Sequence, residues 1–166
     1  MTVRHTRIAS PLGELTVVAD GDALTALYFP GHLRMPPRET FGPREDAAFP
    51  GTRRQLAEYF AGERTVFDLP LAPRGGAFRQ RVWSLLRAIP YGETRTYGDL
   101  ARELGSPGLA QAVGTANGSN PLSIVVPCHR VVGADGTLTG FAGGLHRKRF
   151  LLALEEPPAA TADRLF

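Results

Sequence analysis

Apolar and polar residues alternate along three short runs within the first thirty residues. The runs cover 3–8, 15–19 and 24–29, and turns that contain Gly13 and Gly21 separate them. A period of two is typical of strands that bury one face, and short glycine turns connect antiparallel neighbours. The pattern therefore predicts a three-stranded antiparallel meander at the N-terminus.

One helix is expected to complete this N-terminal half. It follows residues 30–50, which are rich in proline, glycine and charge and are expected to form a loop. Thr52 and Gln55 have the spacing of a capping box, and Gly62 ends the pattern. Residues 66–69 are a candidate for a further strand. This half holds no catalytic constellation, so we assign it a structural role. The helix is expected to pack through Leu56, Tyr59 and Phe60.

Helical spacing takes over after a linker. Residues 70–76 contain two prolines and two glycines. We therefore divide the chain into an N-terminal structural domain, 1–74, and a C-terminal domain, 77–158. A helix that ends before Pro90 opens the second domain. Its buried face is expected to consist of Phe78, Val82, Leu85, Leu86 and Ile89, with Trp83 beside it.

Two short helices with a tight connection follow. The first covers 97–104 and is capped by Thr96 and Asp99, and the second runs from the Ser-Pro pair at 106–107 to about residue 117. Such a pair predicts a helix-turn-helix. The second helix is rich in alanine and glycine, which suits close packing against protein or close approach to another surface.

The last third combines a buried run with a final helix. Residues 122–126 are apolar and mostly β-branched, which predicts a buried extended segment. A turn at 135–136 precedes a helix over 146–155, whose basic start, 146–149, is expected to be solvated or to touch phosphate. The inner face of that helix is expected to hold Phe150, Leu151 and Leu154. The fold class is therefore α+β: a small antiparallel sheet domain with a helix, then a mostly helical domain with a winged-helix-like helix-turn-helix.

The net charge of +3 resides in the second half. Residues 77–154 carry nine bases and four acids, which fits either a solvated basic face or a surface that meets phosphates. No run is long and apolar enough to span a bilayer, and the N-terminus lacks the apolar core of a signal peptide. We therefore expect a cytoplasmic protein without a membrane segment.

Cys128 is the only cysteine. It cannot form an internal disulfide or a multi-thiolate zinc site, so it is either an inert packed residue or a reactive thiol. His129 follows it, and imidazole is the usual group that withdraws a thiol proton near neutral pH. Neighbouring side chains on an extended backbone point apart, so a water could complete the path between them.

Two further polar residues are candidates for this site. Glu155 lies at the end of an apolar helix that must pack on the core, where a surplus acid needs a partner such as His129. A plain helix-end acid is the alternative. Asn120 opens the segment that leads to Cys128, and its amide could clamp that segment or serve only its own backbone.

The sequence resembles the O6-alkylguanine-DNA alkyltransferase family, also called methylated-DNA-protein-cysteine methyltransferases. The most specific likeness is the Pro-Cys-His-Arg-Val string after a β-branched run, in register with Asn120 upstream and Glu155 downstream. The resemblance is dense over about half of the chain and loose over the N-terminal half. Other matching segments are 78–83, 89–94, 96–97, 112–114, 143–144 and 151–155.

The resemblance implies DNA repair by irreversible, single-turnover transfer of an alkyl group from O6 of guanine, or O4 of thymine, without cofactor or metal. Cys128 would be the nucleophile and His129 the base that acts through a water. Glu155 would orient and charge the imidazole, and Asn120 would fix the site. Tyr97 would donate a hydrogen bond toward N3 of the flipped guanine.

The resemblance also implies where DNA binds. The second helix of the helix-turn-helix would enter the minor groove of double-stranded DNA, and a monomer would bind alone or cooperatively. The implied DNA-contacting residues are Thr96, Tyr97, Ala110, Gln111, Gly114 and Arg130. The implied base pocket consists of Val131, Phe141, Ala142 and Gly143.

Departures from the family pattern affect flipping and the pocket. The family commonly has arginine where this chain has Gln111, and many members have tyrosine then serine where it has Phe141 and Ala142. The first change is expected to make base flipping less efficient, and the second is expected to widen or reshape the alkyl pocket. The N-terminal cysteines of zinc-binding relatives are absent.

Two other functions are alternatives to this one. A non-catalytic binder of alkylated DNA, like the alkyltransferase-like proteins, would carry another residue in place of Cys128. A Cys-His-Glu hydrolase would have no use for the basic helix-turn-helix. Release of an acyl leaving group over many turnovers would establish the hydrolase.

Overall fold

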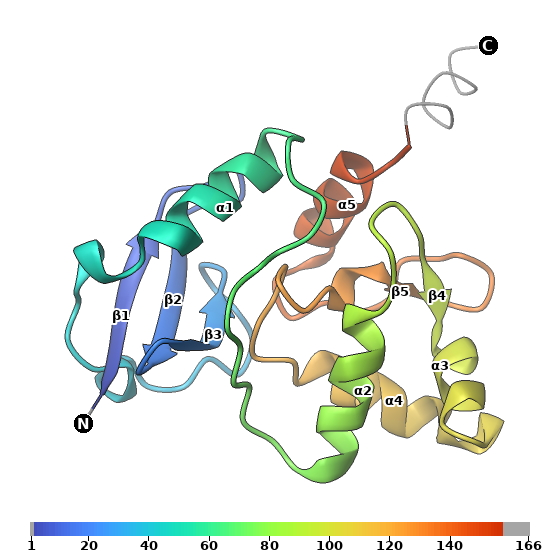
Figure 1. Cartoon of the computed structure of the whole chain (residues 1–166). Helices are drawn as coiled ribbons and strands as arrows, with labels where there is room; N and C mark the ends of the chain where they lie inside the picture. The colour runs from blue at the N-terminus through green and yellow to red at the C-terminus, as the bar shows by residue number, and fades with distance from the viewer. Residues whose placement is uncertain (1, 158–166) are drawn as a thin grey trace.

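The computed structural model describes residues 2–157, and its N-terminal half is built on a three-stranded sheet. Strands β1 (Val3–Ile8), β2 (Leu15–Asp20) and β3 (Ala23–Tyr28) pair antiparallel in the order β1-β2-β3. The predicted meander is therefore confirmed. Helix α1 (Pro50–Phe60) packs its apolar side across this sheet (Figure 1), which buries the alternating side chains of the strands.

Two details of this half differ from the prediction. Helix α1 begins at Pro50, which has the fixed backbone angle suited to a first helical turn, so Thr52 is an internal residue and forms no capping box. Residues 66–69 form no strand. Instead Leu71 pairs with Leu24 of β3, since Leu24 N donates to the Pro70 carbonyl at 2.8 Å. Val66 is the only β-branched residue of this segment, and its side chain is 70% exposed, so strand pairing would bury little of it.

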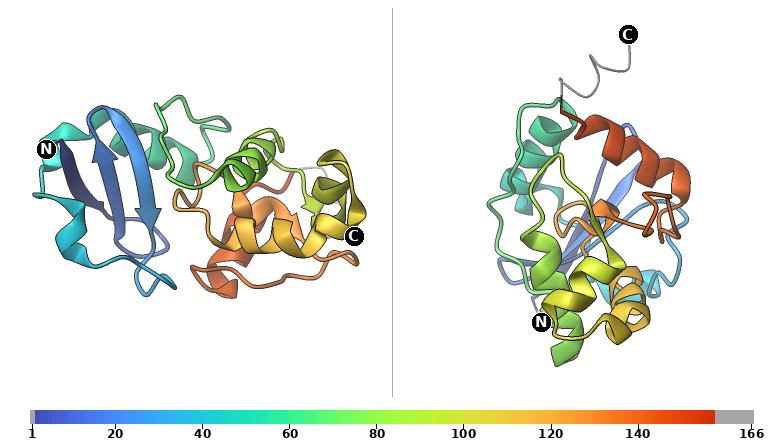
Figure 2. Two further views of the ribbon diagram at one scale, coloured as in Figure 1. Left: turned by 90° about the horizontal axis from the view of Figure 1, so that it is seen from below. Right: turned by 90° about the vertical axis from the view of Figure 1, so that its right-hand side faces the viewer.

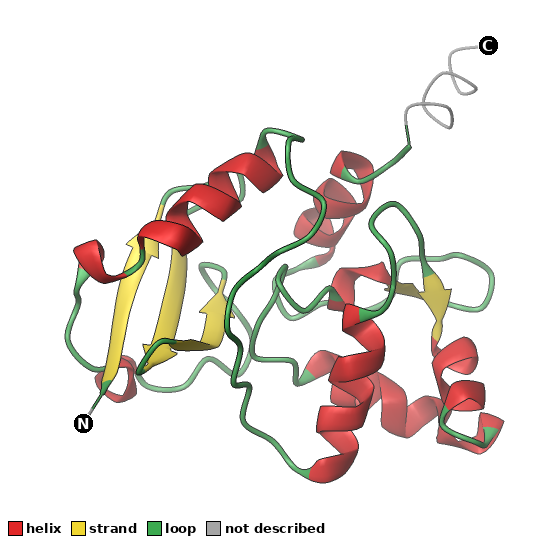
Figure 3. Cartoon of the chain, in the orientation of Figure 1, coloured by secondary structure: helices red, strands yellow, loops and turns green. Residues whose placement is uncertain are grey.

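The C-terminal half is mostly helical, as Figure 3 shows. Its elements in chain order are α2 (Ala77–Arg87), β4 (Arg95–Thr96), α3 (Tyr97–Glu103), α4 (Ala110–Gly118), β5 (Val131–Val132) and α5 (Leu145–Leu154). The mixed α+β fold is therefore confirmed.

The predicted helix-turn-helix is present in α3 and α4. Thr96 accepts from Asp99 N at 3.0 Å and Asp99 accepts from Thr96 N at 2.8 Å, which completes a capping box at the start of α3. Ser106 caps a single 3₁₀ turn, Pro107–Leu109, that leads directly into α4. Both helices are present, so the prediction made from these local capping signals is confirmed.

The run 122–126 was predicted to be extended, and this prediction was wrong. Ile124 has a left-handed backbone with φ of 73°, and Val126 N donates back to the Leu122 carbonyl at 2.9 Å. The chain therefore turns instead of forming a strand. It continues into a 3₁₀ turn, Cys128–Arg130. A β-branched residue rarely adopts a positive φ, so the surrounding contacts must hold this conformation.

Helix α5 also presents its side chains differently from the prediction. Leu151 is buried as expected, but Phe150 is 37% exposed and lies against the Phe60 ring. Lys148, in the run predicted to be solvated, is fully buried. Arg147 is not free in solvent either, because its guanidinium donates to the carbonyls of Leu12, Pro30 and Gly143.

The two halves share one hydrophobic core. Figure 2 shows the sheet and the helical half side by side, and Leu27 of β3 pairs with Leu122 across the junction. Leu27 N donates to the Pro121 carbonyl at 2.8 Å, so the sheet is hydrogen-bonded directly to the segment before Cys128. Within residues 2–157, no helix combines the length and apolar character needed to cross a bilayer.

Candidate active site

Cys128 opens the 3₁₀ turn that precedes β5 and is 5% exposed. Burial raises the pKa of its thiol, because the thiolate loses the solvation of water. A hydrogen bond from the Asn120 side chain and the charge of Lys148 act in the opposite direction. The environment thus holds a protonated thiol at rest and supplies groups that stabilise the thiolate once it forms.

His129 is fully buried beside Cys128. Its Nε2 lies 2.8 Å from Oε2 of Glu155, so the predicted contact between imidazole and carboxylate is present. Burial lowers the pKa of His129 despite the opposing effect of Glu155. Its Nδ1 has no partner among the described residues. A neutral imidazole that donates from Nε2 to Glu155 therefore leaves Nδ1 as a free acceptor.

Glu155 is the centre of a buried network. Burial alone would raise the pKa of this carboxyl, but hydrogen bonds from His129 and Arg130, together with the charge of Arg130, lower it to about 2. Arg130 donates from Nε to Oε1 at 2.7 Å and from a terminal nitrogen to Oε2 at 3.0 Å. Tyr59 donates to Oε2 at 2.5 Å. The carboxylate is therefore ionised and held by donors from three directions.

Arg130 was expected among the DNA-contacting residues, and the structure places it elsewhere. It is 7% exposed, and besides Glu155 it bonds the Ile89 carbonyl at 2.7 Å. Its guanidinium also lies 5.7 Å from the centre of the Tyr91 ring. The fork of an arginine suits a carboxylate in two-point contact. Here that fork is directed inward, and Arg130 serves the carboxylate, not a phosphate.

Asn120 holds the turn that delivers Cys128. Its side-chain amide donates to the Val126 carbonyl at 2.8 Å, and its oxygen accepts from Leu122 N at 3.0 Å. Both bonds are buried and both reach into the segment that contains Ile124. The clamp that sequence reasoning allowed for is therefore present, and it fixes a backbone conformation that the local sequence disfavours.

Lys148 is a component that sequence reasoning missed. Its ammonium donates to the Val131 carbonyl at 2.6 Å and lies 3.4 Å from the Thr139 carbonyl oxygen. Burial lowers the pKa of Lys148, and the charge of the Cys128 thiolate opposes that effect. The available signal was helical spacing, because Lys148, Leu151 and Glu155 follow each other at three and four residues. One face of α5 therefore presents both charges to the site.

Models of one protein family match nearly the whole chain. Residues 3–73 match the ribonuclease-like domain of 6-O-methylguanine DNA methyltransferase, and residues 77–157 match the DNA binding domain of the same family. The chain belongs to the 6-O-methylguanine DNA methyltransferase family. The expected resemblance is thereby confirmed.

Relatives agree with this assignment over more than nine tenths of their length. The methylated-DNA--protein-cysteine methyltransferase of Mycobacterium tuberculosis H37Rv is 50% identical over 164 residues, which is 99% of each chain. The constitutive protein of that name from Bacillus subtilis is 44% identical over 155 residues, covering 91% of this chain and 94% of its own. The M. tuberculosis protein OGT in complex with DNA superposes with a TM-score of 0.88 at 52% identity, over 92% of both chains.

The DNA-contacting residues expected from the 6-O-methylguanine DNA methyltransferase resemblance lie mainly on α3 and α4. Gln111 is exposed on α4, whereas Ala110 and Gly114 are half-buried. The Gly114 backbone faces the Tyr97 ring, since a Cβ there would lie 3.7 Å from the ring edge. Thr96 uses its hydroxyl in the capping box of α3. The exposed part of α4 is therefore smooth around Gln111, which suits close approach to another surface.

The residues expected to form the base pocket line a loop after β5. Val131 is buried, and Phe141 packs against Phe29 of the N-terminal half at 5.9 Å between ring centres. Gly143 must be glycine, because a Cβ would come within 2.3 Å of the Phe29 ring. The Ala142 carbonyl accepts from Leu33 N at 3.0 Å. The N-terminal half thus supports the expected pocket from behind.

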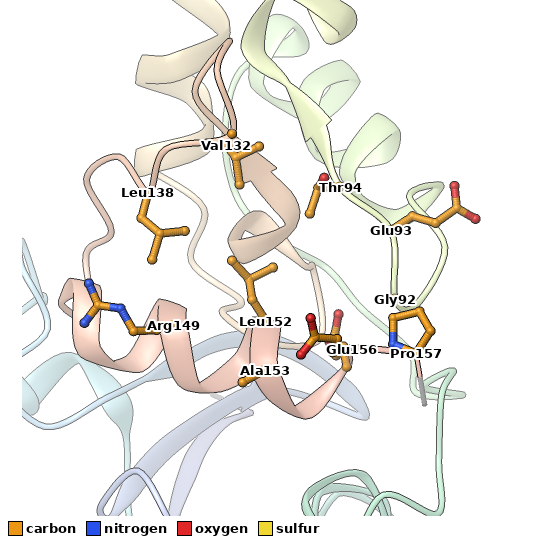
Figure 4. Close-up of a pocket in the computed structure, with 12 residues that line it drawn as sticks. Gly92, Glu93, Thr94, Val132, Leu138, Arg149, Leu152, Ala153, Glu156 and Pro157 are labelled. Carbon is orange, nitrogen blue, oxygen red and sulfur yellow. The ribbon is translucent and has the colours of Figure 1, made fainter. Parts of the chain in front are cut away.

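Tyr97 reaches the same loop from α3. Its hydroxyl lies 2.5 Å from the Thr139 hydroxyl, so it faces the segment between β5 and α5. A cavity of about 370 Å³ lies between the turn at Gly92 and the last turns of α5 (Figure 4). Val132, Leu138, Leu152 and Glu155 are among its lining residues, and Cys128 is not. This hollow therefore adjoins the residue that holds His129, but it does not reach the thiol.

Proposed function

We propose that this member of a DNA repair family transfers the alkyl group from O6 of guanine, or O4 of thymine, in double-stranded DNA to Cys128. The single observation that carries the proposal is the geometry around Glu155. The only thiol of the chain lies beside a buried imidazole, whose Nε2 is 2.8 Å from an ionised carboxylate, next to a helix-turn-helix. This combination suits a nucleophile that must act on DNA without a metal.

In the proposed reaction the Cys128 thiol gives its proton, through a water, to Nδ1 of His129. The unpartnered Nδ1 is the acceptor that such a path requires, and Glu155 stabilises the imidazolium that forms. The thiolate then attacks the alkyl carbon. An S–C bond forms, the C–O bond breaks, and its electron pair passes to the guanine.

The departing guanine carries the electron pair of the broken C–O bond and takes up a proton from water, and His129 returns the thiol proton to solvent. Tyr97 is the proposed donor of a hydrogen bond toward N3 of this guanine. A base reaches this site only after it is rotated out of the duplex, because the thiol is buried. Gln111, exposed on α4, is the proposed residue that fills the space left in the stack. Val131, Phe141, Ala142 and Gly143 are the proposed walls of the base pocket.

The transfer is proposed to occur once per molecule. A thioether is stable to water, and the chain has no second cysteine to take the group from Cys128. The proposal includes a cytoplasmic monomer that binds duplex DNA, alone or cooperatively. Size-exclusion chromatography with and without duplex DNA tests the oligomeric state.

Intact mass spectrometry after mixing with a duplex that contains O6-methylguanine tests the function. The expected result is a gain of one methylene unit per molecule, located on Cys128 by peptide mapping. Cys128→Ala is expected to bind the duplex and gain no mass. Modification at another residue, or turnover of more duplex than protein, would contradict the proposal. Repeated release of an acyl leaving group from a chromogenic ester would instead establish the hydrolase alternative.

A further inference from the structure

A tyrosine from the N-terminal half touches the carboxylate of the candidate active site. Tyr59 lies on α1, 96 residues before Glu155 in the chain, and its hydroxyl donates to Oε2 of Glu155 at 2.5 Å. The same oxygen lies 2.8 Å from Nε2 of His129. We infer that Tyr59 is a positioning residue for alkyl transfer, which holds the Glu155 carboxylate and thereby sets the proton affinity of His129.

The Tyr59 ring is fixed in place. It is fully buried and packs against the rings of Phe60, Phe67 and Tyr91, with centre distances of 5.4, 5.3 and 6.3 Å. The helix that carries it is anchored as well, because Gln55 bonds the backbone of Asp68 through both ends of its amide. The hydroxyl is therefore presented to Glu155 in one orientation.

Glu155 needs such donors because of where it lies. It caps the C-terminal end of α5, where the negative end of the helix dipole disfavours a carboxylate. Burial disfavours the charge further. Oε2 receives three donors, the Tyr59 hydroxyl, the His129 ring and a terminal nitrogen of Arg130, whereas Oε1 receives Nε of Arg130. Tyr59 is the one neutral donor among residues that carry or acquire charge.

The tyrosine can act only as a donor. Burial raises the pKa of its hydroxyl, and the charge of Glu155 raises that pKa further, so the proton stays on Tyr59 throughout the reaction. Each donor draws negative charge from the carboxylate and weakens its attraction for a proton on the imidazole. Several titratable or charged groups face the Glu155 carboxylate and the His129 ring that it contacts. They are Tyr59 from α1, Tyr91 after α2, Arg130 from the turn before β5, and Lys148 from α5.

Removal of the Tyr59 hydroxyl is expected to raise the pKa of His129, so that less of the neutral imidazole is present to accept the thiol proton. In Tyr59→Phe the carboxylate keeps more of its charge, so it stabilises the imidazolium form of His129 more strongly. A larger fraction of His129 is then protonated at a given pH and unable to accept the thiol proton. The acidic limb of the pH–rate profile is expected to move upward by about half a unit to one unit. Transfer near that limb slows about three- to tenfold accordingly.

The experiment compares single-turnover alkylation of the full chain with excess O6-methylguanine duplex across the acidic and neutral range. Tyr91→Phe is the matched control, because it also loses one hydroxyl from the same ring cluster, but that hydroxyl donates to the Leu154 carbonyl at 3.2 Å and not to Glu155. Its profile is expected to coincide with that of the unchanged protein. Circular dichroism at each pH establishes that all three proteins are folded.

This inference rests on the proposed function, and the two fail differently. If the unchanged protein is not alkylated on Cys128, the proposed function is wrong. If it is alkylated and Tyr59→Phe keeps the same acidic limb, Tyr59 is only a packing residue. Should Tyr59→Phe not fold, 3,5-difluorotyrosine at position 59 provides a stronger donor of nearly the same shape. The limb is then expected to move to lower pH, and an unmoved limb overturns the inference.

Discussion

The ammonium of Lys148 lies 2.6 Å from the carbonyl oxygen of Val131, three residues after the only cysteine. This buried charge bonds two carbonyl oxygens and no carboxylate among the described residues. A buried cation without a counter-ion is costly, and that cost falls when Cys128 ionises, because the thiolate charge favours the ammonium. The pair therefore links the charge of α5 to the ionisation of the thiol.

Lys148→Met is expected to slow alkylation of Cys128 by about 10- to 100-fold, because the thiolate loses a stabilising charge and the pKa of the thiol rises further. Rates of Cys128 labelling by iodoacetamide, measured against pH, report that shift directly. Arg149→Met, an exposed change on the same helix, is the control. Equal labelling profiles for both variants would show that the charge of Lys148 does not stabilise the Cys128 thiolate.

His129 and Glu155 are expected to act as one unit, because the carboxylate reaches the reaction only through the imidazole. His129→Gln and Glu155→Gln are each expected to slow transfer by about 100-fold or more, with the double variant little slower than the slower single one. Single-turnover rates on O6-methylguanine duplex measure this coupling. Effects that multiply would mean that Glu155 acts only on the fold.

The same carboxylate also has a structural duty that can be measured apart from the rate. Glu155→Gln leaves Arg130 buried without its counter-charge. We expect a loss of about 3–5 kcal/mol in the free energy of unfolding. His129→Gln leaves the pair of Arg130 and Glu155 intact and is expected to lose clearly less. Urea unfolding of the two variants separates the structural and kinetic roles.

Asn120→Ala is expected to lower the free energy of unfolding by about 2–4 kcal/mol, since it leaves the Val126 carbonyl and the Leu122 amide buried without their partners. Ser119→Ala removes a single bond to the Ala116 carbonyl in a half-buried position and is the control. Urea unfolding midpoints provide the comparison. A loss no larger than that of the control would show that Asn120 does not clamp the turn.

Gln111→Arg is expected to raise the transfer rate on duplex DNA and to tighten DNA binding. Arginine adds the charge and the planar face that glutamine lacks, so it holds an opened duplex more firmly. The reaction with free O6-benzylguanine needs no flipping and is expected to stay unchanged. If the free-base reaction changes as much as the duplex reaction, Gln111 shapes the pocket and does not fill the stack.

His32 is expected to make the fold sensitive to acid. Burial and the charge of Arg147 lower the pKa of His32 to about 4, and its Nδ1 accepts from Phe29 N at 3.4 Å. Between pH 6.5 and 4 the unfolded chain therefore binds a proton that the folded chain does not, so stability falls as the pH falls. His32→Gln is expected to reduce that fall by on the order of 2 kcal/mol. His146→Gln, on the surface, is the control in urea unfolding at both pH values.

Local signals in the sequence were sufficient for much of this structure. The capping box of Thr96 and Asp99 and the alternation along β1–β3 act over a few residues, and both features are present. The prediction of an extended backbone for residues 122–126 was wrong. Hydrogen bonds from the Asn120 side chain outweigh the preference of the β-branched residues in this segment for an extended backbone. Pattern reasoning weighs only the second of these effects.

The parts of the site that sequence reasoning missed depend on distant partners. Tyr59 was assigned to the core, and its ring is there, but its hydroxyl meets an acid from the other half of the chain. The inward fork of Arg130 and the buried ammonium of Lys148 likewise need acceptors that only tertiary structure brings together. A basic residue is normally solvated, so the sequence alone predicted that both side chains lie at the surface.

The pairing of β3 with two later segments has a consequence for solubility. Strand β3 is at the edge of its sheet, and its outward backbone groups are occupied by Leu71 from the linker and Leu122 from the turn before Cys128. An uncovered edge strand is a template for pairing with other chains. The segment before Cys128 therefore covers part of this edge, and we expect a fragment limited to the N-terminal half to leave the Leu27 backbone amide open to pairing with another chain.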